Sequence, residues 1–196
     1  DFYLPIIPTV LLNGIKGIGT GYSTSIPAYN PLKIIKNVKK CIEGTEMEEL
    51  IPWYNKFTGK ISKLDEKKYL TYGKYKRLSP TIVQVTELPV GVWTEKYKQV
   101  LEKFCIDTKN PKKSQFIQNY EDNSTDENVD IKIKCHYKVI LGLRKIKQDT
   151  SGYMDGFERK LHLTKSISNS NIHLYDTEHH VQKYENVLDI IRNFVQ

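Results

Sequence analysis

The sequence predicts an α+β fold in which a mixed or antiparallel sheet is flanked by helices. Short runs of alternating apolar and polar residues predict strands, while amphipathic segments of helical period predict helices between them. Of the 196 residues, 39% are hydrophobic and 27% are charged, so one large or two small domains can bury a real core. We expect a first domain at residues 1–58 and a second at residues 59–196.

The first domain contains two predicted elements on either side of a glycine-rich loop. Residues 6–12 form an apolar run that we expect to be extended. A helix is expected at residues 31–42, because Asn30 is a good N-cap, Pro31 suits the first helical position and Gly44 can end the helix. On this helix the apolar side chains share one face and the lysines share the other. These lysines are Lys33, Lys36, Lys39 and Lys40.

The second domain alternates predicted strands with predicted helices. Strands are expected near residues 59–64, 69–75, 81–88, 131–139 and 160–166. Helices are expected at residues 94–104 and 186–195. A basic cluster at residues 60–77 is expected to span two short strands joined near Gly73, which would place Lys74, Lys76 and Arg77 at or beside the hairpin turn. The acidic, polar stretch at residues 121–130 is typical of an exposed loop.

Four glycines fall within residues 14–21, and such a density requires positive φ angles or the close approach of another molecule. The loop is not a nucleotide-binding motif, because Tyr22 replaces the third glycine of the dinucleotide fingerprint and Thr20 replaces the P-loop lysine. It carries Lys16 and the branched Ile18. Backbone amides and hydroxyls could bind DNA phosphates while an exposed aliphatic wedge enters a base step. The alternative is a tight strand-to-helix connection whose isoleucines are buried.

The composition favours an anionic partner. The formal net charge is +7 and the isoelectric point is near 9.1. No run of about 18 apolar residues is present, so we expect no transmembrane span. The first residues lack both a signal sequence and an initiating Met, which suggests a fragment of a longer protein. Three widely spaced cysteines fit reduced thiols in a nuclear or cytosolic compartment and lack the spacing of a zinc site.

The segment at residues 5–31 closely resembles the segment of eukaryotic-type DNA topoisomerase II that follows the active-site tyrosine in that family. Shorter matches continue in the same order, at residues 57–59, 87–90, 93–94, 169–176, 183–184 and 189–191. The resemblance implies the tower region of such an enzyme with the adjoining edge of its DNA gate. In that family the isoleucine of the GIGTG string intercalates between base pairs, and it matches Ile18.

The resemblance also implies a function and a partner. The partner is double-stranded DNA, and the intact enzyme is a homodimer that uses ATP and Mg²⁺ to break one duplex, pass a second through it and reseal the break. We expect no catalytic residue, metal site or cofactor in this chain, because the tyrosine-bearing motif precedes it. The candidate DNA contacts are Asn13, Lys16, Gly17, Ile18, Gly19, Thr20, Lys33, Lys36, Lys40, Lys74, Lys76 and Arg77.

The chain departs from the family pattern at three places. A lysine at position 16 replaces the usual glutamate, which adds positive charge beside the expected DNA. Gly91 replaces an arginine that commonly follows the ELPV string in the family. Residues 138–160 match the family pattern poorly. Composition rich in Lys, Ile and Asn suits an AT-rich protist or a large cytoplasmic DNA virus, so we expect localisation to the nucleus or to a viral replication site.

Two other classes of protein stay open. One is a nuclease or gyrase-like enzyme of different chemistry, against which the GIGTG string argues. The other is a non-catalytic basic scaffold or DNA-binding module, in which the lysine-bearing helix face is either a solvated surface or a protein contact.

Overall fold

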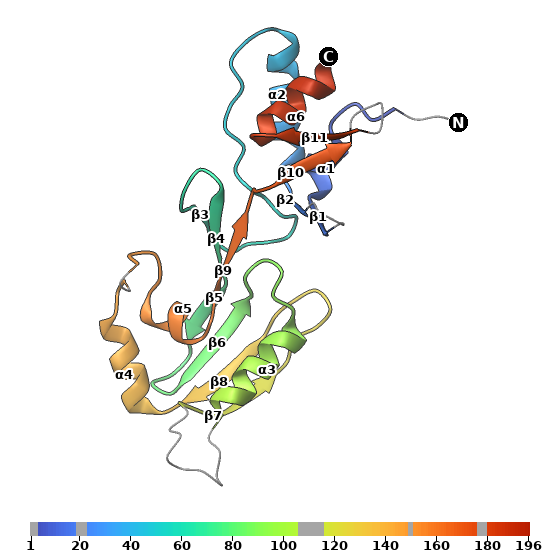
Figure 1. Cartoon of the computed structure of the whole chain (residues 1–196). Coiled ribbons are helices and arrows are strands. Elements are labelled where there is room, and N and C mark those ends of the chain that lie inside the picture. The colour runs from blue at the N-terminus through green and yellow to red at the C-terminus, as the bar shows by residue number, and fades with distance from the viewer. Residues whose placement is uncertain (1–3, 19–22, 106–115, 149–150, 176–179) are drawn as a thin grey trace. The chain divides into compact units, whose positions relative to one another are not determined.

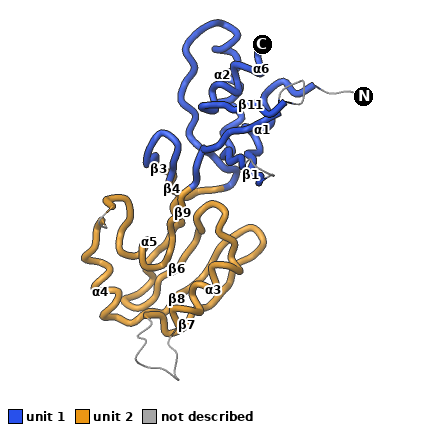
Figure 2. The backbone as a smooth tube through the Cα atoms, viewed as in Figure 1, with its two compact units in different colours: residues 1–56, 63–69, 167–196 blue, residues 57–62, 70–166 orange. Residues whose placement is uncertain are grey.

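The structure is a computed structural model that describes residues 4–18, 23–105, 116–148, 151–175 and 180–196. Antiparallel sheets with flanking helices are present, which confirms the predicted α+β class (Figure 1). The chain divides into two compact units (Figure 2). Unit 1 contains residues 1–56, 63–69 and 167–196, and unit 2 contains residues 57–62 and 70–166.

The units differ from the predicted domains at the C-terminal end of the chain. The predicted break after residue 58 lies close to the end of the first segment of unit 1, at residue 56. Residues 167–196 belong to unit 1, whereas the prediction placed them in the second domain. The sequence did not indicate that residues 167–196 join unit 1, because this depends on packing between segments far apart in the chain.

Helix α1 (Thr9–Asn13) occupies the second half of the segment that was predicted to be extended, so that prediction is wrong there. Leu11 on this helix is fully buried in unit 1. Gly14 ends the helix with a φ of 69°, and a Cβ at this position would lie 2.8 Å from the carbonyl oxygen of Ile26. Only glycine fits this close approach at positive φ.

Helices α2 (Pro31–Ile42) and α6 (Val187–Val195) pack against each other in unit 1. Asn30 caps α2 as predicted, because its side chain accepts a hydrogen bond from the Leu32 amide at 2.9 Å. Asn186 and Asp189 form a capping box at the start of α6. The fully buried side chains of this core are Leu11, Tyr29, Ile34 and Ile191.

Two antiparallel ribbons complete unit 1. Strand β1 (Ile15–Ile18) pairs with β2 (Ser23–Ile26), and β10 (Ile172–Tyr175) pairs with β11 (Val181–Tyr184). A three-stranded sheet has the order β3-β4-β9. Its strands are β3 (Ile61–Lys63), β4 (Lys68–Tyr72) and β9 (Thr164–Ser168).

Unit 2 is built on a four-stranded antiparallel sheet of order β5-β6-β8-β7. Its strands are β5 (Lys74–Arg77), β6 (Ile82–Glu87), β7 (Ile117–Asp122) and β8 (Ile131–Cys135). Its helices are α3 (Thr94–Phe104), α4 (Tyr137–Lys145) and α5 (Gly156–Lys160). The core joins apolar side chains of β6 and β8 with Tyr97 and Leu101 of α3. None of the helices in the described ranges is both long and apolar enough to cross a membrane.

The predicted hairpin at Gly73 is wrong, because β4 pairs with β3 and β9 whereas β5 pairs with β6. Gly73 instead lies where the chain leaves one sheet for the other, and its amide donates to the Leu163 carbonyl at 2.8 Å. A Cβ at Gly73 would lie 2.4 Å from the Glu87 carbonyl oxygen, so the two backbones approach too closely for any other residue.

Three further boundaries in unit 2 differ from the predictions. The acidic stretch begins inside β7, an edge strand whose side chains are mostly exposed and therefore lack the apolar signal of a strand. The strand predicted at residues 131–139 ends at Cys135, and α4 follows it. The strand predicted at residues 160–166 begins only at Thr164, because α5 and its capping box at Asp155 precede it.

We expect Ile133→Ala to lower the free energy of unfolding of unit 2 by about 2–5 kcal/mol, because the side chain is fully buried on a central strand. Chemical denaturation followed by circular dichroism measures the change. Lys134→Ala on the same strand removes an exposed side chain and should change stability by less than about 0.5 kcal/mol. Equal effects of the two substitutions would contradict the assigned strand faces.

Candidate nucleic-acid interface

The β1–β2 ribbon presents an exposed isoleucine. Ile18 is the last described residue of β1, pairs with Ser23 of β2, and has 87% of its surface exposed. Ile15 is 40% exposed. The interpretation of these isoleucines as buried core residues is therefore wrong for Ile18.

Strand alternation places Lys16 and Ile18 on one face of β1 and Ile15 and Gly17 on the other. All four residues are exposed. A Cβ added to Gly17 would meet no atom of the described structure within 4 Å, so packing within unit 1 does not require this glycine. The ribbon therefore carries one cation and one large apolar side chain on the same face, beside an open backbone.

The other candidates in this segment lie on either side of the described part of β1. Asn13 lies at the end of α1 and is exposed. Gly19 and Thr20 lie outside the described residues.

Hydrogen bonds from β2 hold the ribbon in place within unit 1. The Thr24 hydroxyl donates to the His173 carbonyl at 2.8 Å, and the His173 amide donates back to the hydroxyl at 3.3 Å. Ser25 and Ser170 exchange two backbone hydrogen bonds, each of 3.2 Å. The Asn171 amide group donates to the Ser23 hydroxyl at 3.2 Å. β2 thus lies between β1 and the segment that leads into β10.

The predicted lysine face of α2 is present, and three of its four lysines pair with one carboxylate. Lys33, Lys36 and Lys40 converge on the carboxylate of Glu48, with N–O distances of 3.7 Å for Lys33 and 3.2 Å for Lys40. The hydrogen bonds of Lys36 and then of Lys40 lower the pKa of Glu48 to about 2. Three lysines and one carboxylate leave this cluster with a net charge of +2.

A buried asparagine fixes Glu48 opposite the lysines. Asn37 on α2 is 1% exposed, and its side-chain NH₂ donates to the Glu48 carbonyl at 2.7 Å while its oxygen accepts from the Glu48 amide at 2.9 Å. Sequence reasoning missed both residues, because Asn37 interrupts the apolar face and Glu48 lies 11 positions away in a segment without periodicity. The polar residue within an otherwise apolar face was the one available signal.

The three candidates of the predicted hairpin lie on β5 of unit 2. Lys74, Lys76 and Arg77 are all exposed. Arg77 shares a strand face with Tyr75, whose hydroxyl donates to Asp155 at 2.7 Å, and Lys76 lies on the opposite face. β5 therefore carries cations on both faces and does not bring all three to one turn.

The described residues provide no metal centre. No group of three or more His, Cys, Asp or Glu side chains in these ranges is arranged to hold an ion.

The comparisons with known proteins agree along the whole chain. Residues 1–196 match the family described as the A subunit of DNA gyrase/topoisomerase IV. The DNA topoisomerase 2 of Arabidopsis thaliana is 36% identical over 197 aligned residues, which cover 98% of this chain and 12% of that protein. That of Plasmodium falciparum (isolate K1 / Thailand) is 35% identical, with 99% and 13% covered. The chain thus spans 12–13% of the length of these two relatives.

A solved structure has the same fold. The Plasmodium falciparum topoisomerase II DNA-binding, cleavage and re-ligation domain matches with a TM-score of 0.87 and 34% sequence identity. The match covers 100% of this chain and 25% of that one.

We expect the Glu48 carboxylate to titrate near pH 2 in a carbon-detected NMR titration, because the lysines favour its charged form. Since the pKa is lowered by folding, the stabilisation is complete above the ordinary value of 4.5 and is lost as the pH falls towards 2. Replacing Lys36 and Lys40 by methionine should return the pKa towards 4.5. A pKa near 4.5 in the unsubstituted chain would contradict the convergence of the lysines.

Proposed function

The chain belongs to the family of DNA gyrase/topoisomerase IV A subunits, and we propose that it binds and bends the duplex that a type II topoisomerase cleaves. The observation that carries the proposal is the exposed Ile18 beside Lys16 on one face of the β1–β2 ribbon. The printed name of the matching solved structure, a DNA-binding, cleavage and re-ligation domain, supports the same partner.

Ile18 acts as a wedge between two base pairs. A large aliphatic side chain that is 87% exposed to water gains apolar contact when it enters a base step. Unstacking one step requires a few kcal/mol, which the added protein contacts of a bent duplex offset. The short ribbon suits this task, because the hydrogen bonds of Thr24 and Ser25 hold it at its base.

Phosphate contacts supply the affinity. Lys16 projects from the same face as Ile18, so its ammonium group can bind a phosphate next to the opened step. The α2 cluster of Lys33, Lys36, Lys40 and Glu48 adds a net charge of +2 within the same unit. These contacts are independent of sequence and sensitive to salt.

The β5 cations Lys74, Lys76 and Arg77 of unit 2 extend the proposed contacts. They bind phosphates of the duplex that flanks the bent step, and all three are exposed enough to do so.

The longer protein carries out the complete reaction. It is a homodimer that breaks both strands of one duplex, passes a second duplex through and reseals the break, with ATP and Mg²⁺ as cofactors. The described residues of this chain include no group of His, Cys, Asp or Glu side chains that could hold the ion. The enzyme works in the nucleus, or at a cytoplasmic replication site if its source is viral.

We expect Ile18→Ala to reduce the bend of a bound duplex and to lower relaxation of supercoiled plasmid by the full-length enzyme by about tenfold or more, which corresponds to about 1.4 kcal/mol. Fluorescence energy transfer between the duplex ends measures the bend. Ile15→Ala removes the same atoms from the opposite face of β1 and should retain both activities. Equal loss in the two variants, or no loss in either, would contradict the wedge.

We expect Glu48→Gln to strengthen binding of duplex DNA, because it removes the charge that competes with phosphate for three lysines. The slope of log K against log salt concentration should become steeper by up to about 0.9. Glu49→Gln is the matched control, since Glu49 pairs with Lys63 and not with the α2 lysines. Unchanged affinity and slope in Glu48→Gln would remove the α2 cluster from the interface, and salt-independent binding would favour the scaffold alternative.

A further inference from the structure

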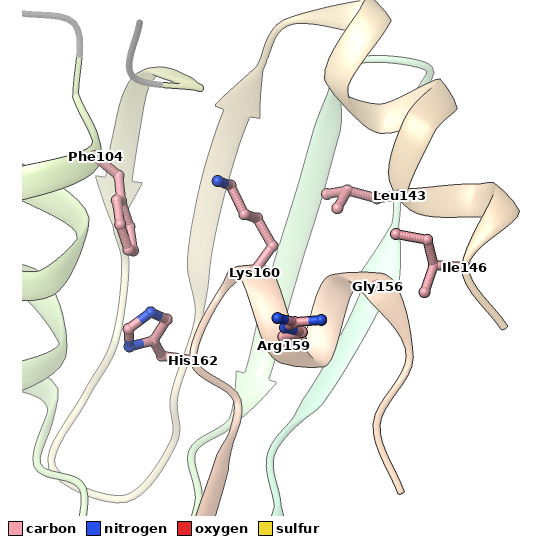
Figure 3. A pocket seen from close by; sticks show the side chains of 7 residues that line it. All are labelled: Phe104, Leu143, Ile146, Gly156, Arg159, Lys160 and His162. Atoms are coloured by element: carbon pink, nitrogen blue, oxygen red, sulfur yellow. The ribbon is translucent and has the colours of Figure 1, made fainter. Parts of the chain in front are cut away.

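Unit 2 contains a pocket that the proposed DNA contacts do not use. It has a volume of about 400 Å³ and lies between the end of α3, the end of α4 and the short helix α5 (Figure 3). Volumes of this size are typical of sites for small molecules. The side chains that line it come from Phe104, Leu143, Ile146, Arg159, Lys160 and His162.

Cations and apolar groups divide the lining of this pocket. Leu143 and Ile146 lie on its α4 side, while Lys160 and His162 lie towards Phe104 (Figure 3). The Lys160 ammonium group is 4.8 Å from the ring centroid of Phe116. Arg159 and Lys160 form no ion pair within the described ranges, and the described lining residues include no carboxylate. The described lining therefore combines two cations with apolar surface.

A neighbouring pocket differs by a carboxylate in its lining. It shares Leu143 and Ile146 and is also lined by Arg77, Arg144 and Lys147. It includes the carboxylate of Asp155, which accepts hydrogen bonds from the Tyr75 hydroxyl and the Glu158 amide. An anion would meet repulsion from Asp155 there. Of these two pockets, only the one lined by Arg159 and Lys160 has no carboxylate among its described lining residues.

The end of α5 supplies a second, independent observation. Leu163 donates to the Glu158 carbonyl at 2.8 Å and His162 donates to the Arg159 carbonyl at 3.4 Å, which is the Schellman arrangement at a helix end. His162 occupies the left-handed position with a φ of 54°, where glycine is the usual residue. Its ring meets Phe104 edge-on, with 5.3 Å between ring centroids, at the wall of the pocket. An imidazole thus stands at the pocket wall where helix termination alone favours glycine.

We propose that this pocket binds a small organic anion, a carboxylate or phosphate attached to an aromatic or aliphatic body. The acidic group faces Arg159 and Lys160, whose hydrogen bonds to an anion are charge-assisted. The apolar body lies against Phe104 and Ile146. Duplex DNA fits this site poorly, because a backbone phosphate carries no apolar group to cover these side chains.

Titration calorimetry of the full chain with 1-naphthyl phosphate tests the proposal. We expect saturable 1:1 binding, with at least tenfold weaker binding of both inorganic phosphate and neutral 1-naphthol, since each lacks one half of the recognised chemistry. Arg159→Gln and Lys160→Gln should each weaken binding about tenfold. Lys103→Gln is the matched control, because Lys103 is an exposed lysine next to Phe104 that does not line the pocket.

Two further variants separate binding from folding. His162→Gly relieves the left-handed strain, so the melting temperature should be retained while binding weakens. Ile146→Asn changes a side chain that is 43% exposed and should weaken binding of 1-naphthyl phosphate without unfolding the chain. No saturable binding, or equal affinity in the Arg159→Gln, Lys160→Gln and Lys103→Gln variants, would overturn the proposal. Displacement of the probe by a short DNA duplex would also overturn it, because the pocket would then belong to the DNA interface.

Discussion

The hydrogen bonds between β2 and the segment at residues 170–173 position the exposed face of unit 1. The reciprocal pair between Thr24 and His173 joins residues that are 149 positions apart in the chain. A two-stranded ribbon is marginally stable by itself, so an exposed Ile18 on β1 needs this support to keep one orientation. The supporting residues belong to the C-terminal segment, which explains why residues 167–196 return to unit 1. The exposed Ile18 of β1 therefore depends for its support on residues of the C-terminal segment.

A buried polar side chain, that of Asn37, helps to set the charge on the surface of α2 in unit 1. Asn37 satisfies both backbone groups of Glu48 and so holds a carboxylate against three lysines of α2. This carboxylate keeps the lysines extended together in the absence of DNA and reduces their net charge. A phosphate that replaced it would find the lysines already grouped, at the expense of ion pairs that are exposed and therefore weak. Salt and competing anions should accordingly tune this part of the interface.

Much of the fold followed from the sequence, because strong local signals existed. The cap at Asn30 and Pro31 located α2, and the period of residues 94–104 located α3. Failures occurred where tertiary contacts decided the outcome: α1 within an apolar run, the sheet change at Gly73, and the polar edge strand β7. For the candidate site, the sequence led us to select Ile18 and the lysine face. It did not lead us to Glu48 and Asn37, because no periodic pattern in the sequence links these two residues. The cations of β5 were wrongly placed at a turn, because β5 pairs with β6 and not with β4.

The central claim is that Ile18 opens a base step in bound DNA. Duplexes with the fluorescent base 2-aminopurine at successive positions measure this directly, because the base brightens when it loses a stacking neighbour. The account predicts that binding of the full-length enzyme brightens the probe at one step and that Ile18→Ala abolishes the increase while Ile15→Ala retains it. An unchanged signal at every position, or the same increase with Ile18→Ala, would contradict it.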